Sequence, residues 1–107
     1  MSKELVKAKP AIKEKIAPRL DITEPSLYRV IYMNDETTTV EFVIESLVTI
    51  FNHSRADAMD LTQQVHLEGS AVVALLPYEM AEQKGVEATQ LARNNGFPLV
   101  IKLEADE

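Results

Sequence analysis

Hydrophobic and polar positions divide this chain into strand-like and helix-like segments. Residues 27–33 are mostly β-branched, aromatic and apolar, a composition typical of a β-strand, and the polar residues 34–36 end that strand as a turn. Thr38 and Glu41 then match the Thr-x-x-Glu capping box that precedes many helices. Apolar residues wrap a wide face of the next segment, so we predict a largely buried helix that continues through Phe51.

The second half of the chain predicts two more helices and two more strands. Ser54 is a candidate N-cap and Gly69 a candidate C′ residue for a second helix. The apolar residues 70–76 predict a short strand, and Pro77 stands where a third helix can begin. Residues 99–103 are the last predicted strand. Small residues form a stripe along the third helix that can pack closely on a sheet: Ala81, Gly85, Ala88 and Ala92.

This β-α-α-β-α-β order predicts an α+β fold, with a three-stranded antiparallel or mixed sheet and three helices packed on one face. Residues 26–107 are predicted to form a single domain, which suits the chain length. Residues 1–25 contain three prolines and few large apolar side chains, so we predict a flexible N-terminal extension there.

Charge is distributed unevenly along the chain, whose net charge is −6. Residues 1–19 carry six basic and two acidic side chains, whereas residues 20–107 carry five basic and fifteen acidic ones. An acidic body repels nucleic-acid phosphates and attracts ammonium groups. No apolar run is long enough to span a membrane, and no cysteine is present. We therefore expect a cytoplasmic protein without a nucleic-acid or membrane partner.

Enzymatic and metal-binding readings find little support. His66 and Asp35 could form a base and its orienting group, but the serines lie in no nucleophile elbow and the glycines form no phosphate loop. His53, Asp57, Asp60 and His66 lack the close histidine pairing of familiar metal sites. We expect no catalysis, no metal and no cofactor.

The turn after the first strand is the better candidate for function. Asn34 and Asp35 offer oxygen acceptors beside two apolar elements, and His66 lies on a predicted helix whose neighbours, Val65 and Thr62, can face the same spot. A lone histidine on a half-apolar helix is also commonly a hydrogen-bonded structural residue, and the pattern alone leaves both interpretations open.

Four blocks of sequence resemble the ClpS family of bacterial N-end rule adaptors. Residues 30–43, including the Asn-Asp turn before the Thr-rich cap, resemble its opening block, and residues 65–69 (VHLEG) resemble its second block. Residues 77–84 and 98–104 are similar to its third block and its closing strand. The blocks occur in the order and spacing of that family.

The resemblance implies an α+β sandwich and a non-enzymatic role as an adaptor. Members of the family bind the free N-terminus of a protein whose first residue is bulky and hydrophobic (Leu, Phe, Tyr or Trp), a signal called an N-degron. They deliver it to a Clp unfoldase, by docking on the N-terminal domain of ClpA or, in some organisms, on ClpC. A monomer is expected, and the N-terminal extension is expected to engage the unfoldase.

The resemblance also implies roles for particular residues. Asn34, Asp35 and His66 match the positions that bind the α-amino group. Glu79 and Lys84 match positions that contact the unfoldase. The positions of the side-chain pocket and its rim are Thr38, Val40, Val43, Thr62, Val65 and Leu99.

Two rim residues depart from the family pattern. Methionine is common at both positions, whereas this chain has the stiff, shorter Val40 and the hydroxyl-bearing Thr62. Our hypothesis is that this rim changes the discrimination among first residues. Peptides that differ only in residue one test it, and an unchanged ranking in the Val40→Met, Thr62→Met double variant would contradict it.

A second function remains open at this point. A plain protein-interaction domain, similar to the C-terminal domain of the ribosomal stalk protein, would recruit partners through a helix face and ignore free N-termini. It would have no use for Asn34, Asp35 and His66, so these residues discriminate between the two hypotheses.

Overall fold

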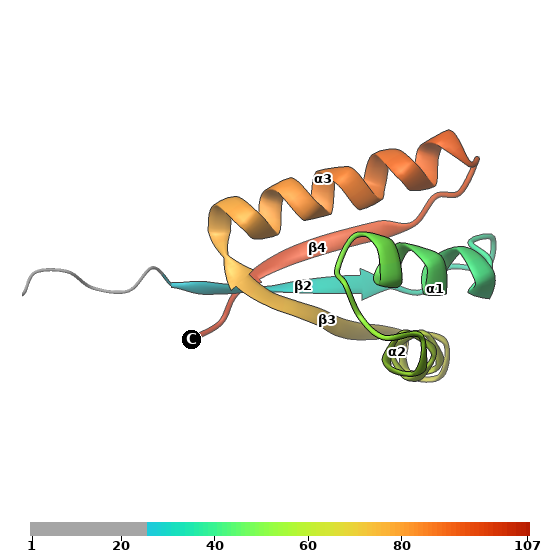
Figure 1. The fold of residues 1–107 in the computed structure, drawn as a ribbon, viewed down its shortest axis with the longest axis horizontal. Helices are drawn as coiled ribbons and strands as arrows, with labels where there is room; N and C mark the ends of the chain where they lie inside the picture. The colour runs from blue at the N-terminus through green and yellow to red at the C-terminus, as the bar shows by residue number, and fades with distance from the viewer. Residues whose placement is uncertain (1–25) are drawn as a thin grey trace, which may run out of the picture.

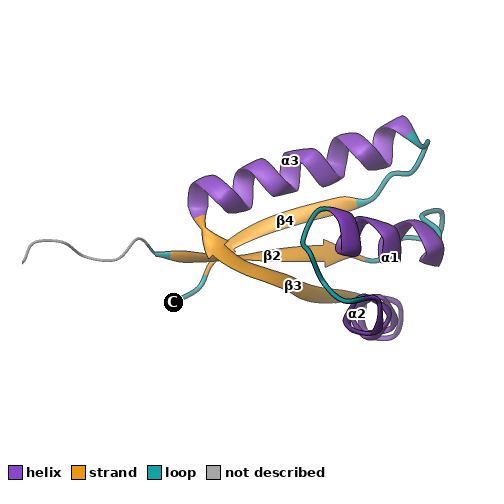
Figure 2. Cartoon of the chain, viewed as in Figure 1, coloured by secondary structure: helices purple, strands orange, loops and turns teal. Residues whose placement is uncertain are grey.

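A computed structural model describes residues 26–107 of the chain. The elements follow the predicted order, as Figures 1 and 2 show. They are β2 (Leu27–Met33), α1 (Val40–Thr49), α2 (Arg55–Glu68), β3 (Ser70–Pro77), α3 (Tyr78–Asn94) and β4 (Val100–Ala105). The predicted N-terminal extension, residues 1–25, lies outside the described residues.

The three strands form one sheet in the order β3-β2-β4, and both pairings are antiparallel. The prediction of an antiparallel or mixed sheet is therefore confirmed in its antiparallel form. Between β2 and β3 the register shifts after Val30, whose partner is Ala74, while Ile31 pairs with Val72. The residue left over is Val73, and its carbonyl oxygen lies 2.6 Å from Nε2 of His53. Since a carbonyl can only accept, that nitrogen carries the proton.

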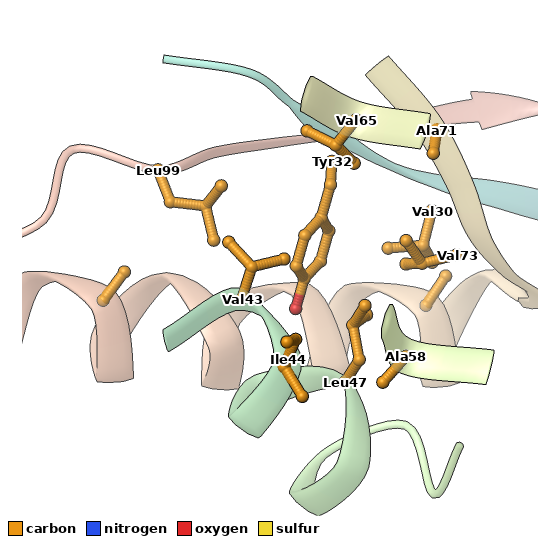
Figure 3. Close-up of a cluster of buried hydrophobic side chains, with 12 residues drawn as sticks. Val30, Tyr32, Val43, Ile44, Leu47, Ala58, Val65, Ala71, Val73 and Leu99 are labelled. Atoms are coloured by element: carbon orange, nitrogen blue, oxygen red, sulfur yellow. The ribbon is translucent and has the colours of Figure 1, made fainter. Parts of the chain in front are cut away.

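The core lies between one face of the sheet and the helices. Val30 and Tyr32 of the central strand are fully buried and pack with Val43, Leu47 and other helix residues in one cluster, as Figure 3 shows. The hydroxyl of Tyr32 shares a 2.8 Å hydrogen bond with Ser46 of α1. Burial raises the pKa of Tyr32 to about 12 although that hydrogen bond acts in the opposite direction.

Helix α3 packs closely on the sheet through its small residues. All four members of the predicted stripe, from Ala81 to Ala92, are buried. A methyl group built on Gly85 would lie 3.9 Å from the side chains of Ile101 and Leu103 of β4, which is ordinary van der Waals contact. Figure 1 shows α3 running along the sheet beside β4. The predicted role of the stripe is confirmed.

The helix caps match the sequence prediction at two positions and differ at one. Ser54 caps α2 by accepting from the backbone N–H of Asp57, and Gly69 ends α2 in the left-handed conformation with φ 92°. The capping box that we predicted at Thr38 is wrong by one residue, because α1 is capped by Thr39, which accepts from Phe42. The hydroxyl of Thr38 instead donates a hydrogen bond to Oδ2 of Asp35. In residues 26–107, no helix is long and apolar enough to cross a membrane.

Candidate functional site

A cavity of about 340 Å³ opens where β2 ends and α1 and α2 approach each other. The structure brings most of the predicted binding residues together around it. Its lining comprises Asn34, Asp35, Glu36, Thr38, Val40, Val43, Thr62, Val65 and His66. Polar residues come from the turn after β2 and from the end of α2, while the valines come from the two helices.

A backbone hydrogen bond holds the two polar segments together. The N–H of Asn34, directly after β2, donates to the carbonyl oxygen of Gly69 at 2.9 Å. Gly69 is the left-handed residue at the end of α2, and its own N–H donates to Val65. This connection fixes the last turn of α2, which carries His66, beside the turn after β2. Asn34 and His66, far apart in the sequence, therefore line one cavity.

Asp35 organises the turn with three hydrogen bonds. Its Oδ1 accepts from the backbone N–H groups of Thr37 and Thr38, both at 2.7 Å. Its Oδ2 accepts from the hydroxyl of Thr38, also at 2.7 Å. A carboxylate offers about four lone-pair sites, so Oδ2 retains one for another donor. The turn therefore holds a partly used, rigidly oriented acceptor at the edge of the cavity.

Asp35 is also held in its charged form. Burial acts to raise its pKa, but the hydrogen bonds from Thr38 and Thr37, together with the positive charge of Arg93, outweigh burial and hold the pKa below its usual value. The carboxylate is therefore ionised at neutral pH. It presents a negative charge to the cavity that a protonated amine would match.

The floor of the cavity is apolar. Val43 and Val65 are buried. Thr62 is 5% exposed, and its hydroxyl donates to the carbonyl oxygen of Ala58 at 2.7 Å within α2. The proton of that hydroxyl is thereby used inside the helix, so Thr62 offers the cavity no free donor. The cavity combines polar acceptors at its rim with an apolar interior.

Three predicted site residues lie outside this cavity. Leu99, predicted as a wall residue, is 1% exposed and belongs to the core cluster, where Figure 3 shows it near Val43. Glu79 and Lys84, predicted to contact the unfoldase, lie on α3. Glu79 is exposed, whereas Lys84 is half-buried and its ammonium donates to the carbonyl oxygen of Ile50 at 2.9 Å. Lys84 thus has a structural partner inside the molecule.

Sequence reasoning missed two contributors to the site. Glu36 lines the cavity, and its position next to Asp35 in a polar turn was the available signal. Arg93 of α3 donates to the carbonyl oxygens of Phe97 and Leu99, at 3.0 and 2.8 Å, and its charge lowers the pKa of Asp35. Nothing in the sequence indicated that Arg93 would act on a turn so distant along the chain.

Within residues 26–107, no group of three histidine or acidic side chains is placed to hold a metal ion. In the same part of the chain the Asp35 carboxylate accepts hydrogen bonds from Thr37 and Thr38 and none from His66. The arrangement fits the binding of a cation that carries an apolar group.

The structure is that of a small α+β protein with a cavity at one end of its sheet, and comparison with known proteins identifies its family. The family model described as "ATP-dependent Clp protease adaptor protein ClpS" matches residues 23–102. The chain belongs to this family, and it is therefore an adaptor of the Clp protease and not an enzyme. This family membership favours the adaptor over the stalk-like interaction domain that the sequence left open.

Individual relatives agree with this assignment. The ATP-dependent Clp protease adapter protein ClpS of Clostridium acetobutylicum is 39% identical over 95 residues, which are 89% of this chain and 94% of that protein. The adapter of the same name from Nautilia profundicola is 42% identical over 85 residues, 79% of this chain and 88% of that protein. The structure of Agrobacterium tumefaciens ClpS2 bound to L-phenylalaninamide is similar, with a TM-score of 0.75 and 37% identity, covering 78% of this chain and 100% of that chain.

Proposed function

We propose that the chain binds the free N-terminus of proteins whose first residue is bulky and hydrophobic, Leu, Phe, Tyr or Trp. The observation that most directly supports this proposal is the ionised carboxylate of Asp35, whose Oδ2 retains an acceptor site at the rim of an apolar cavity. An α-ammonium group is a charged donor directly attached to a carbon that also carries the side chain. It can occupy the rim while the first side chain enters the cavity.

The similar solved structure of Agrobacterium tumefaciens ClpS2 supports this proposal. Agrobacterium tumefaciens ClpS2 was solved with L-phenylalaninamide, which has a free amine, an aromatic side chain and an amide in place of the next peptide bond. In this chain, Asn34 and His66 supply further polar atoms next to Asp35, and Val43 and Val65 supply apolar walls. A charge-assisted hydrogen bond contributes about 1.5–3 kcal/mol and a buried apolar side chain a similar amount, so micromolar, releasable binding is expected.

The test is fluorescence anisotropy with a labelled peptide that begins with Leu or Phe, compared with the same peptide acetylated at its N-terminus. We expect binding of the free peptide only. Asp35→Asn should weaken that binding at least tenfold, because it removes the charge and the Oδ2 acceptor while its amide oxygen can still accept from Thr37 and Thr38. Equal binding of both peptides would contradict the proposal.

Glu36→Gln is the matched control, because it removes the same charge from the next residue of the same cavity lining. The Glu36 side chain is exposed, so we expect a loss of less than threefold. Similar losses in the two variants would show that the cavity attracts the amine by its overall negative charge and not through Asp35. Circular dichroism of both variants checks that the fold is unchanged.

Delivery is the second half of the proposed function. We propose that the adaptor passes its substrate to the ClpA or ClpC unfoldase in the cytoplasm, with Glu79 and Lys84 at the contact and residues 1–25 engaging the unfoldase. Deletion of residues 1–25 should then leave peptide binding nearly intact and slow the degradation of a reporter with an N-terminal Leu. Loss of peptide binding itself on deletion would contradict this division of labour.

A further inference from the structure

A second hollow of about 220 Å³ lies between residues of α1 and α2 and adjoins the cavity. Its lining residues are Val40, Ile44, Met59, Thr62, Gln63 and His66. Val40, Thr62 and His66 also line the first cavity, so these three form a wall between the two spaces. We call the second space the Met59 groove. Its lining includes His66, one of the residues proposed to bind the α-amino group.

The Met59 groove is an exposed apolar surface that the core does not explain. Met59 is 52% exposed and Val40 is 54% exposed, and the two lie on different helices. Exposed apolar side chains that gather in one patch can mark an interaction site or a ligand-binding groove. Methionine is long and adaptable, so it suits a surface that must accept varied partners.

We infer that the Met59 groove receives the side chain of the second residue of the bound protein, so that the adaptor reads two residues. This inference rests on the proposed function. Successive side chains of an extended chain point to opposite sides. When the first side chain occupies the cavity, the second side chain therefore points out of it. The groove shares Val40, Thr62 and His66 with the cavity and offers that side chain an exposed apolar surface next to it.

The dimensions agree with this assignment. Consecutive Cα atoms of a peptide lie about 3.8 Å apart, and a helix rises about 1.5 Å per residue. The part of α2 from His66 to Met59 is therefore about 10 Å long, which spans the Cα positions of about three extended residues. In a peptide whose α-amino group lies near His66, the Cα atom of the second residue falls within that length. Gln63, in the same lining, carries an amide that can bond to the peptide backbone.

The inference predicts a preference at position two of the substrate. Peptides that begin Leu-Leu or Leu-Phe should bind about three- to tenfold more tightly than a peptide that begins Leu-Ala and is otherwise identical, because they bury more apolar surface. Met59→Ala should reduce that ratio to below twofold and change the affinity for the Leu-Ala peptide less than twofold. This pattern, a coupling between one protein residue and one peptide residue, is what a double-mutant cycle measures.

Val86→Ala is the control, because Val86 of α3 is as exposed as Met59, at 52%, and does not line the groove. It should leave the ratio unchanged. Equal affinities for the Leu-Ala and Leu-Leu peptides, or an unchanged ratio in Met59→Ala, would overturn the inference. A Met59→Ala variant that alters the preference for residue one instead of residue two would also overturn it, since the groove would then extend the first-residue cavity.

The proposed function fails separately from this inference. It fails if the Leu-Ala peptide shows no binding that acetylation abolishes. If that peptide binds through its free amine and the second residue has no influence, the function stands and the reading of two residues is wrong.

Discussion

At the residue scale, the candidate site depends on how the oxygens of Asp35 are shared. Three of its hydrogen bonds hold the turn, and the remaining acceptor on Oδ2 is available to a ligand. The same bonds lower the pKa of the carboxyl group against the effect of burial. A group with a lowered pKa contributes stability above its unfolded pKa of about 3.8 and loses it as the pH falls through the folded value. The turn therefore stays formed and charged across the physiological range.

Tyr32 shows the opposite behaviour and allows a test of the core. Its pKa is raised from 10.0 to about 12 by burial, so its stabilising effect is present below pH 10 and is lost as the pH rises toward 12. Tyr32→Phe should lower the free energy of unfolding by about 1 kcal/mol at pH 8, because the hydrogen bond to Ser46 is lost. The difference from the natural protein should shrink as the pH rises from 10 to 12. Urea denaturation across that range measures it.

Tyr78→Phe is the control for this measurement. The hydroxyl of Tyr78 donates to Glu82 at 3.3 Å, and both residues are exposed. Substitutions at such a position usually change the free energy of unfolding by less than about 0.5 kcal/mol. If Tyr32→Phe were as mild as Tyr78→Phe at pH 8, the buried hydrogen bond would contribute nothing to stability.

At the element scale, the ends of the helices determine where the site residues stand. Helix α2 ends at Gly69 in the left-handed conformation, and the carbonyl oxygen of that residue accepts from Asn34. An L-residue with a side chain adopts this conformation at a cost. The end of α2 is thus coupled to the turn after β2 through one residue whose backbone geometry favours glycine.

A pair of glycine substitutions tests this coupling. Gly69→Ala should lower the free energy of unfolding by about 1–2 kcal/mol through backbone strain, since a methyl group there meets nothing within 4 Å. It should also weaken peptide binding, because His66 and Asn34 lie on either side of the coupling. Gly85→Ala, inside α3, should raise the free energy of unfolding by about 0.5–1 kcal/mol and leave binding unchanged. Thermal or urea denaturation with a peptide titration measures both, and equal effects of the two substitutions would contradict the strain argument.

At the scale of the whole molecule, two side chains fasten the segment between α1 and α2 to distant parts. His53 bonds to the bulged Val73 of β3, and Lys84 of α3 donates to Ile50 at the end of α1. Both bonds join residues at least 20 positions apart. They hold the two helices that carry the cavity in place against the sheet.

Lys84 therefore has a structural task in addition to the proposed contact with the unfoldase. Lys84→Met keeps most of the apolar stem but removes the donor, so it should lower the free energy of unfolding by about 1–2 kcal/mol. Glu79→Gln, at an exposed position on the same helix, should leave stability within about 0.5 kcal/mol.

Binding of the unfoldase, measured for the two variants well below their unfolding temperatures, separates the two tasks. Both variants should bind the unfoldase more weakly if both residues contact it. Impaired binding in Lys84→Met alone, in proportion to its lost stability, would indicate that Lys84 acts only within the fold.

The sequence by itself determined the elements and several of their ends. Ser54 and Gly69 predict the two ends of α2 because of their local capping chemistry. The small-residue stripe of α3 is predicted from helical periodicity. Such signals depend on residues within one or two turns of one another. Residue patterns alone predict an α+β domain, and the resemblance of four blocks to the ClpS family predicted the adaptor role that family membership shows.

Tertiary structure decided what depends on residues far apart in the chain. It set the strand order, placed Leu99 in the core and gave Lys84 a partner in Ile50, the C-cap residue of α1. It determined that the hydroxyl of Thr62 donates to Ala58 and that the hydroxyl of Thr38 donates to Asp35. The second of these bonds corrects the predicted capping box. When a side chain has several possible partners, the position of its backbone decides which of them is within hydrogen-bonding distance. That position is fixed only when the whole core packs.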